Sequence, residues 1–335
     1  MSEWYVGGGE TPGAAERFPC YVRASMAAQP ARPPSSTPTL PKHVHAHLRE
    51  TLPGARPERA KWIGSGWGSD AFLVPSEDGD WVARLPRNVP WSIEDLEREV
   101  RLLPLLQARP FEIVTPRDAR VVRDAEGAFV AAIHRMVPGA SSKGRRILGQ
   151  AREEHLAAVG RFLATLHTTP HDEARAHGVE VRDLWREVSR PRIEETMALA
   201  GPVTRAWLAD RLEAFEALDS QVPVALVHGD LSGEHLLMDE AGHLSGVIDF
   251  ADARLTDPAL DFAGVLNRFS LRDLEVVGQH YDAPQDPKLL ERARIYIDIV
   301  PIYSVTDGYI AAGEAERAQG LRRLAGRAAT WARSR

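Results

Sequence analysis

A change of hydrophobic periodicity at Pro138-Gly139 is the feature that most constrains the fold of this chain. Before it, apolar runs within 59–87 and 112–140 are bounded by turn residues, as strands are, and the segment 92–106 between them has helical spacing. After it, apolar residues recur at mostly helical spacing to the C-terminus. This order predicts an α+β, bilobal chain, with a small β-rich lobe joined by a short hinge to a larger helical lobe.

The same pattern predicts the boundaries of three segments. Residues 1–40 are rich in Gly, Pro, Ser and Ala and have little periodic apolar pattern, so we expect them to be disordered. We place the small lobe at 41–136 and the large lobe at 137–335. The sequence leaves open whether the natural chain starts at Met1 or at Met26.

Composition narrows the kinds of partner and compartment. The formal net charge of -6 argues against a partner held mainly through nucleic-acid phosphates, because such proteins usually carry a basic surface. The single cysteine, Cys20, excludes an internal disulfide framework and a thiolate metal cluster. No apolar run reaches the roughly 18 residues of a membrane span, and the N-terminus lacks the apolar core of a secretion signal. We therefore expect a cytoplasmic protein that binds neither nucleic acid nor membrane.

A glycine-rich turn lies between the first two expected strands. In GSGWGSD, residues 64–70, glycine occupies every second position from Gly64 to Gly68. Glycine lets backbone amides approach phosphate oxygens closely, so this turn suits a phosphate chain. It is not a dinucleotide-binding fingerprint, because a strand follows where that motif needs a helix, and no Lys-Ser or Lys-Thr pair completes a P-loop. A flexible hairpin turn is the alternative interpretation.

A cation on the next expected strand faces this turn. Arg84 lies in WVARLPR, flanked by apolar residues, and a guanidinium group can hold phosphate oxygens in pairs. Its expected partner is a carboxylate on the helix that follows, where Glu97 and Glu99 are the candidates. Leucines lie three, four and seven positions after Glu99, so the helical period places Glu99 on the inward stripe. The alternative is an ordinary exposed acid on a surface helix.

Ionisable residues gather at expected strand ends in LVHGDLSGEHLLMDEAGHLSGVIDF, residues 226–250. Asp230 follows one strand, His235 begins the next, and Asp249 ends a third, so hairpin pairing brings His235 and Asp249 side by side. Such a pair can hold a Mg²⁺ that bridges nucleotide phosphates, while a separate carboxylate orients the attacking hydroxyl. Because Mg²⁺ prefers oxygen ligands, histidine is an unusual ligand on chemistry alone. A hairpin whose Asp and His side chains cap turns is the alternative.

Together these pieces resemble the aminoglycoside and macrolide phosphotransferases, small-molecule kinases with a fold similar to that of protein kinases. The family signature H-G-D-x-x-x-x-N/H followed by I-D-F/W is matched by 228–230, His235 and 248–250. The resemblance covers about 45–330, and the late segment YIDIVPIYSVTDGYIAAG is most similar to aminoglycoside 2''-phosphotransferases. It implies a bilobal, protein-kinase-like fold and transfer of the γ-phosphate of ATP or GTP to an antibiotic hydroxyl.

The resemblance also implies a role for each motif. Asp230 would be the catalytic carboxylate, and His235 and Asp249 would bind Mg²⁺, which supplies the missing argument for a histidine ligand. The small lobe, 41–136, would bind the nucleotide, and the large lobe, 137–335, would carry the catalytic and substrate-binding residues. The residues implied in nucleotide binding are Ser65, Gly66, Ser69, Arg84, Glu99, Arg135 and Val137.

The acceptor side departs from the family pattern. The 2''-phosphotransferases place acids for substrate ammonium groups on the helix after the Asp-Phe pair, whereas this chain has the segment 267–270, which includes Arg268. Arg84 also replaces the usual lysine. The polar residues that remain as acceptor ligands are Ser232, Asp252, Asp273, Asp298, Tyr303 and Asp307. The alternatives to an antibiotic phosphotransferase are a kinase for a sugar, an amino alcohol or a nucleoside, and an inactive nucleotide-binding module. We expect a monomer.

Three further ionisable residues have expected structural roles. Asp257 and Asp261 follow the motif at a turn and at the start of a helix, where acids cap backbone amides. His167 ends a long apolar helix, where its charge would complement the helix dipole.

Overall fold

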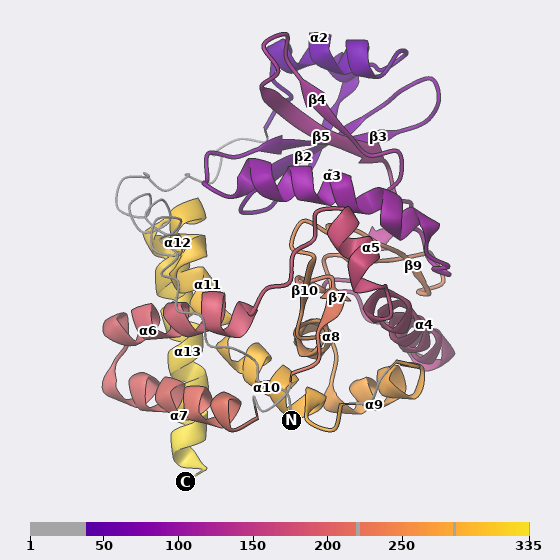
Figure 1. The fold of residues 1–335 in the computed structure, drawn as a ribbon. Coiled ribbons are helices and arrows are strands. Elements are labelled where there is room, and N and C mark those ends of the chain that lie inside the picture. Colours follow the sequence, from indigo (N-terminus) through magenta and orange to yellow (C-terminus); the bar gives the residue numbers. More distant parts are fainter. Residues whose placement is uncertain (1–37, 219–221, 284–285, 335) are drawn as a thin grey trace, which may run out of the picture.

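The structure is a computed structural model that describes residues 38–218, 222–283 and 286–334. Most of the segment 1–40, for which disorder is predicted, lies outside the described residues, and so do Cys20 and Met26. The described chain is α+β, with a five-stranded antiparallel sheet first and mostly helices after it. Figure 1 shows the sheet above the helical lobe, so the change of periodicity correctly predicts the fold class.

The small lobe is built on the five-stranded sheet, whose strand order is β1-β2-β3-β5-β4. Two tight turns follow from local chemistry: Gly79 adopts a φ of 113° between β2 and β3, and Asp124 accepts the amides of Glu126 and Ala128 between β4 and β5. The strands are β1 (Lys61–Ser65), β2 (Ser69–Val74), β3 (Trp81–Pro86), β4 (Arg120–Arg123) and β5 (Phe129–Arg135).

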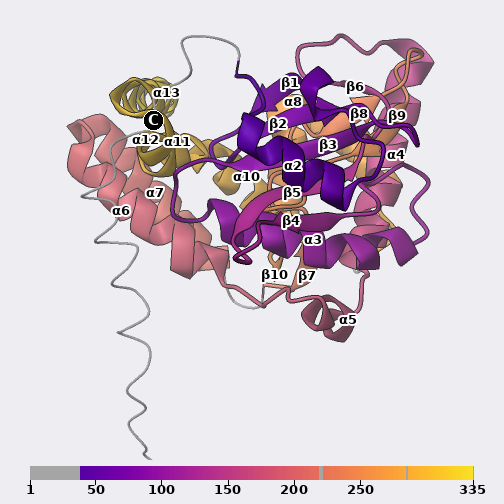
Figure 2. The same cartoon turned by 90° about the horizontal axis from the view of Figure 1, so that it is seen from above.

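Two helices flank the sheet and pack into different hydrophobic cores. Helix α2 (Lys42–Thr51), followed by the short η1 (Pro57–Arg59), packs Val44 and Leu48 against the sheet, and Figure 2 shows α2 above the strands. Helix α3 (Ser92–Ala108) lies on the other side, and its leucines 102–106 belong to the core of the large lobe. Helix α3 therefore belongs to both lobes, and its central residues face the place where they meet.

The large lobe is mainly helical. In both views α6, α7, α11, α12 and α13 lie to one side of the sheet (Figures 1 and 2), and Figure 1 shows α4, α8 and α9 below it. The helices are α4 (Gly149–His167), α5 (His171–Ala176), η2 (Trp185–Ser189, a π-helix), α6 (Arg190–Leu199), α7 (Pro202–Leu218), α8 (Ala259–Arg268), α9 (Leu271–Gln279), α10 (Leu289–Ile299), α11 (Pro301–Val305), α12 (Asp307–Ala312) and α13 (Glu314–Arg333). No helix of the described segments combines the length and the apolar composition that crossing a membrane requires.

Short strands of the large lobe bring the segment 226–250 together. Strand β7 (Ala225–Val227) pairs with β10 (Arg254–Thr256), and a second ladder has the order β6-β8-β9. The strands of that ladder are β6 (Ala140–Ser141), β8 (Leu236–Met238) and β9 (Leu244–Val247). The β8–β9 pair is the hairpin that the sequence predicts, with Leu236 opposite Val247. The ends of β7 and β9 and the start of β8 therefore lie close to one another.

Candidate active site

The loop after β7 carries Asp230, and a glycine makes its shape possible. Gly229 has a φ of 85°, which other residues rarely adopt, and an added Cβ there would lie 2.3 Å from the carbonyl oxygen of Asp252. The preceding His228 is fully buried, and its Nε2 donates to the carbonyl of Ile248 at 3.0 Å. The loop is thus packed against the segment after β9, while the side chain of Asp230 remains 58% exposed.

Asp261, near the start of α8, holds this loop from behind. Its carboxylate oxygens accept the amides of His228 and Gly229 at 2.8 and 2.9 Å, and Nε2 of His167 lies 3.0 Å from it. Burial would raise the pKa of Asp261, but these hydrogen bonds keep it below its usual range. His167 occupies the last turn of α4, and its Nδ1 lies 2.8 Å from the hydroxyl of Tyr281. It therefore belongs to a buried hydrogen-bond network, which the helix-dipole interpretation does not predict.

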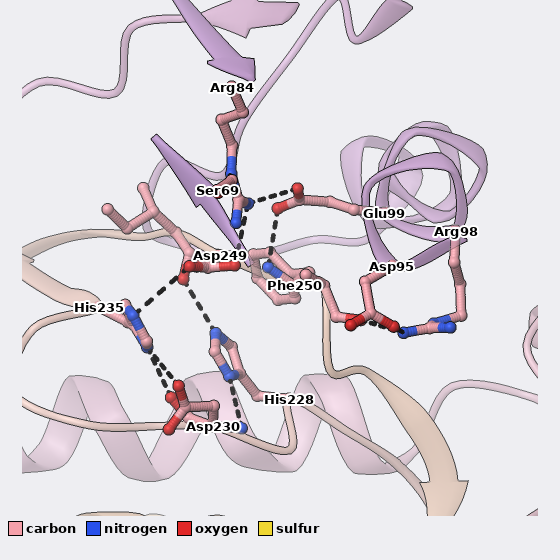
Figure 3. A network of polar contacts seen from close by, with 12 residues as sticks. Ser69, Arg84, Asp95, Arg98, Glu99, His228, Asp230, His235, Asp249 and Phe250 are labelled. Carbon is pink, nitrogen blue, oxygen red and sulfur yellow. Dashed lines mark hydrogen bonds and ion pairs between the residues drawn. The ribbon is translucent and has the colours of Figure 1, made fainter. Parts of the chain in front are cut away.

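His235 and Asp249 face each other, as Figure 3 shows. Nε2 of His235 lies 3.6 Å from Oδ2 of Asp249, and Nδ1 lies 2.6 Å from the carbonyl oxygen of Asp230. Because a carbonyl only accepts, Nδ1 carries a proton, so Nε2 is the nitrogen that a metal can take when the ring is neutral, and it faces Asp249. Burial alone would lower the pKa of His235, but the carboxylates of Asp249 and Asp230 outweigh it, so the pKa lies above its usual value. A tautomer fixed by the backbone suits a metal ligand, so this pair fits the predicted Mg²⁺.

Asp249 adopts an unusual backbone conformation. Its φ is 67°, and Asp118 is the only other non-glycine residue with a positive φ in the described part of the chain. Asp and Asn tolerate this region better than most residues. One carboxylate oxygen lies 2.9 Å from Arg84 while the other faces His235. Burial would raise the pKa of Asp249, but the guanidinium of Arg84 and the imidazole of His235 in its protonated form hold it well below its usual range.

Arg84 and Glu99 form the ion pair that the sequence predicts. The guanidinium donates to Glu99 Oε2 at 2.6 Å, and its Nε lies 3.3 Å from the hydroxyl of Ser69. The other oxygen of Glu99 accepts the amide of Phe250 at 2.9 Å. Glu99 is 1% exposed, whereas Glu97 is half-buried and pairs with an arginine of β4. Helix α3 is therefore bonded both to the cation on β3 and to the backbone that follows Asp249 (Figure 3).

The carboxylate of Asp230 has a different environment from that of Asp249. Partial desolvation raises the pKa of Asp230, the imidazole of His235 lowers it, and the carboxylates of Asp252 and Asp249 raise it. Within the described residues, no arginine or lysine pairs with Asp230; its ionisable neighbour is His235, whose Nδ1 lies 3.7 Å away. Asp230 is therefore the acid of this group that remains accessible and without a strong cationic partner.

The other residues predicted to bind a nucleotide lie along the sheet and the connection to the large lobe. Ser65 bonds to Asp70, and the amide of Gly66 donates to the carbonyl of Ser69 at 2.9 Å, so the turn is closed by its own backbone. The side chain of Arg135 pairs with Asp78 and Asp118 and stacks on Trp81. Val137 is 2% exposed.

The residues predicted to bind an acceptor fall into two sets: Ser232 and Asp252 near Asp230, and the residues on the helices of the large lobe. The hydroxyl of Ser232 accepts the amide of Glu234 at 3.3 Å, and the charge of Asp252 raises the pKa of Asp230. Tyr303 bonds to Ser189 at 2.9 Å.

Each of the three remaining acids has an arginine partner. Arg152 donates to both oxygens of Asp273 at 2.9 and 2.6 Å, and Asp273 also closes a capping box at the start of α9. Arg192 donates to both oxygens of Asp307 at 2.6 and 2.7 Å. Asp298 pairs with Arg211 at 3.1 Å. Asp298 also lines a cavity of about 570 Å³ between α7, α10 and α13, whose wall includes no residue of the loop 228–235.

The contacts of two arginines at the site have no local signal in the sequence. Arg98 of α3 donates to the carbonyl of Ala251, which adds a second bond between α3 and the segment after Asp249. Arg268, at the end of α8, donates to the carbonyls of Ser142 and Arg145 at 3.1 and 2.6 Å. The position where acids are expected in the family thus holds a cation that orders 142–145. Neither contact follows a local pattern, because each partner is more than a hundred residues away.

Known proteins share this fold. A model of the phosphotransferase enzyme family matches residues 59–296. The uncharacterized protein YcbJ of Bacillus subtilis (strain 168) is 27% identical over 134 residues, 39% of this chain and 43% of that protein, so the match spans less than half of its length. The GDP and kanamycin complex of APH(2'')-IIIa is 22% identical, with a TM-score of 0.74 over 86% of this chain and 99% of that chain.

A second solved structure is similar. The apoenzyme of macrolide 2'-phosphotransferase MphH from Brachybacterium faecium is 24% identical, with a TM-score of 0.65 over 85% of this chain and 98% of that chain. At these identities the two structures establish the fold, and what each binds is a property of that protein.

Proposed function

This chain belongs to the phosphotransferase enzyme family, and we propose that it is a small-molecule kinase that transfers the γ-phosphoryl group of ATP or GTP to a hydroxyl group. The observation that carries the proposal is the pairing of an exposed carboxylate, Asp230, with the neighbouring His235 and Asp249. One acid is then accessible to an acceptor, and a separate pair of side chains is available for a cation beside it.

Asp230 would orient the acceptor. The acceptor hydroxyl donates to its carboxylate, and the hydroxyl oxygen forms a bond to the γ-phosphorus as the bond from that phosphorus to the β,γ-bridging oxygen breaks. The nucleoside diphosphate leaves, and Asp230 receives the hydroxyl proton. The buried contacts of Asp261 with the backbone of 228–229 fix the loop in place during this step, which matters because positioning supplies much of the rate enhancement.

Nε2 of His235 and Oδ2 of Asp249 would hold Mg²⁺, which when bound neutralises charge on the β- and γ-phosphates. In the described segments no group of three or more His, Cys, Asp or Glu side chains is arranged to hold a metal. Phosphate oxygens and water therefore complete the coordination in this proposal, as is usual for Mg²⁺ in nucleotide sites.

The small lobe, 41–136, would bind the donor nucleotide. Arg84, oriented by Glu99, lies beneath the loop that includes Ser65, Gly66 and Ser69, and the backbone of 135–137 would contact the base. The large lobe, 137–335, would bind the acceptor through Asp230 and its surroundings. GDP bound to the related APH(2'')-IIIa supports a nucleoside triphosphate as donor.

The acceptor class follows from charge. We propose an antibiotic hydroxyl, as in the aminoglycoside and macrolide enzymes of similar fold, and within that class an acceptor with few ammonium groups. Arginines already compensate Asp273, Asp298 and Asp307, so these acids offer little net charge to a polycation. The same observation keeps a sugar, amino alcohol or nucleoside as the second candidate. The acidic chain would act as a monomer in the cytoplasm.

Mg²⁺-dependent nucleotide consumption tests this proposal. The purified chain is incubated with ATP or GTP and a panel of macrolides, aminoglycosides, sugars, amino alcohols and nucleosides, and products are identified by mass increase. We expect turnover with a macrolide-like or other weakly charged acceptor, and none in Asp230→Asn. Nucleotide binding that does not depend on Mg²⁺, with no turnover of any acceptor, would contradict the proposal and favour an inactive module. Size-exclusion chromatography at the 37.0 kDa of the chain tests the monomer.

A further inference from the structure

The tip of the glycine-rich loop lies against helix α12 of the large lobe. Trp67 stands at that tip between Gly66 and Gly68 and is 36% exposed. At Gly308, in α12, an added Cβ would lie 2.9 Å from Cζ2 and 3.3 Å from Cη2 of the Trp67 ring. The indole therefore packs directly on the backbone of α12, and the absence of a side chain at Gly308 leaves the space that the ring occupies.

Arg87 makes a second connection between the same two segments. It follows β3, and its Nη1 donates to the carbonyl of Gly66 at 2.7 Å while its Nη2 lies 3.5 Å from the carbonyl of Ala311 in α12. Its own amide donates to the carbonyl of Gly68 at 2.9 Å. The loop tip is thus held on both sides of Trp67 by an arginine that also reaches α12.

Helix α12 is in turn fixed to the rest of the large lobe. Its first residue, Asp307, accepts two hydrogen bonds from Arg192 of α6. The ring of Tyr309 lies 3.3 Å from the guanidinium carbon of Arg317 in α13. Through α12, the loop of the small lobe is therefore connected to α6 and α13 of the large lobe.

We propose that Trp67 is a positioning residue that couples the glycine-rich loop to α12 by packing on Gly308. The proposed function supplies the identity of the two ligands, whereas the contact itself does not depend on it. A nucleotide that orders the loop then also orders α12, and by thermodynamic reciprocity an acceptor beside α12 favours the closed loop. Without the contact, the loop tip moves independently and admits water, so more γ-phosphoryl groups are transferred to water as free phosphate and fewer to the acceptor.

Hydrogen exchange of α12 amides tests the coupling without any turnover. The variants are Trp67→Ala, the conservative Trp67→Phe, and Trp62→Ala as a control. Trp62 lies on β1, is 37% exposed and donates its indole N–H to Ser65 at 3.1 Å, so its variant removes another tryptophan from the base of the same loop. Each is measured alone and with Mg²⁺ and a non-hydrolysable ATP analogue. We expect exchange at 307–312 to be about 5-fold faster or more in Trp67→Ala, unchanged in Trp62→Ala, and close to wild type in Trp67→Phe. The analogue should protect α12 in the wild type and fail to do so in Trp67→Ala.

Gly308→Ala tests the contact from the other side. Alanine favours a helix over glycine, and its Cβ would lie 2.9 Å from the indole of Trp67 and 2.8 Å from Cγ of Glu316, a flexible side chain of α13. We expect faster exchange at 64–69 in Gly308→Ala, on the opposite lobe from the substitution. Wild-type exchange of α12 in Trp67→Ala, or of the loop in Gly308→Ala, overturns the coupling.

Turnover distinguishes positioning from a purely structural contact. In Trp67→Ala we expect the acceptor KM to rise about 5-fold or more, and a larger fraction of consumed nucleotide to appear as free phosphate, with Trp67→Phe restoring both. An unchanged ratio of free phosphate to phosphorylated acceptor overturns the positioning role even if exchange changes. A wild-type chain that phosphorylates no acceptor refutes the proposed function instead, and the exchange experiments still decide the coupling.

Discussion

The aspartates of the large lobe fall into two groups with opposite surroundings. Asp230 is exposed and, in the described residues, has no arginine or lysine partner, although its loop is tightly held by Asp261. On the helices, Asp273 and Asp307 each receive two hydrogen bonds from one arginine. The first arrangement leaves a carboxylate available to a ligand, and the second uses carboxylates to join helices.

This difference shows that the aspartates of the chain serve two separate purposes. A carboxylate paired with a guanidinium attracts a cationic ligand only weakly, whereas the oxygens of one without such a partner stay available to a ligand. Asp249 lies between the two cases, since Arg84 contacts one of its oxygens and the other faces His235. Four substitutions can break or sharpen the comparison.

The largest effect is expected at the uncompensated acid. Asp230→Asn keeps the shape of the side chain but removes the proton acceptor, so kcat should fall by about 10²- to 10⁴-fold. The melting temperature should stay within about a degree or two of wild type, because the side chain is exposed and carries few packing contacts. Steady-state kinetics with thermal denaturation measures both. A variant with near-normal kcat would show that Asp230 is not the catalytic carboxylate.

Asp249→Asn should have the next largest effect. Asparagine tolerates the φ of 67° at this position, so the backbone should persist while the negative metal ligand is lost. We expect kcat to fall by roughly 10²- to 10³-fold, and the Mg²⁺ concentration for half-maximal rate to rise. Titration of activity with Mg²⁺ measures this. If the variant has the Mg²⁺ dependence of the wild type, Asp249 does not bind the metal.

Glu99→Gln should have an intermediate effect, with Glu97→Gln as its matched control on the same helix. Glutamine can still accept the Phe250 amide but loses the ionic bond to Arg84. Charged hydrogen bonds contribute about 1.5–3 kcal/mol, so we expect a roughly 10- to 100-fold loss of kcat/KM for the nucleotide. Glu97 pairs with β4 instead, and its variant should match wild type. If the two substitutions had equal effects on kcat/KM, Glu99 would have no specific role in nucleotide binding.

The smallest effect on activity is expected at a compensated acid, Asp273. Burial would raise its pKa, but Arg152 and Ser270 lower it to about 2. Since the unfolded value is about 3.9, this group contributes stability above pH 4 that is lost as pH falls toward 2, about 2 kcal/mol in all. Asp273→Asn should therefore lower the free energy of unfolding at pH 7 by about that amount.

The same variant also tests the comparison directly. Urea denaturation at pH 7 and pH 2.5 should show a difference from wild type that shrinks at the lower pH, while Glu275→Gln, at an exposed position of α9, changes neither. We expect kcat/KM for the acceptor to stay within about twofold of wild type, because Arg152 already engages the carboxylate. A large loss of activity with unchanged stability would indicate that Asp273 binds the acceptor after all.

Much of the fold is predictable because its signals are local. The glycine-rich turn, the hairpin at 236–247 and the helix that bears Glu99 all follow from turn residues and from spacings within about 15 residues. The choice of Glu99 over Glu97 is likewise correct, because the buried stripe of one helix is a property of its own period. His235 and Asp249 are neighbours for the same reason, since a hairpin brings its two ends together.

The sequence by itself thus determined the α+β order, the loop that carries Asp230 and the inward face of α3. Tertiary structure decided which acids are compensated: Arg152 lies 121 residues from Asp273, Arg192 lies 115 from Asp307, and Arg211 lies 87 from Asp298. It also decided that Trp67 packs on Gly308. Periodicity specifies which side of an element is buried, but the partner of a charged or aromatic side chain depends on how distant elements pack. The sequence offers no local rule for choosing the partner of one acid among its 41 arginines and lysines.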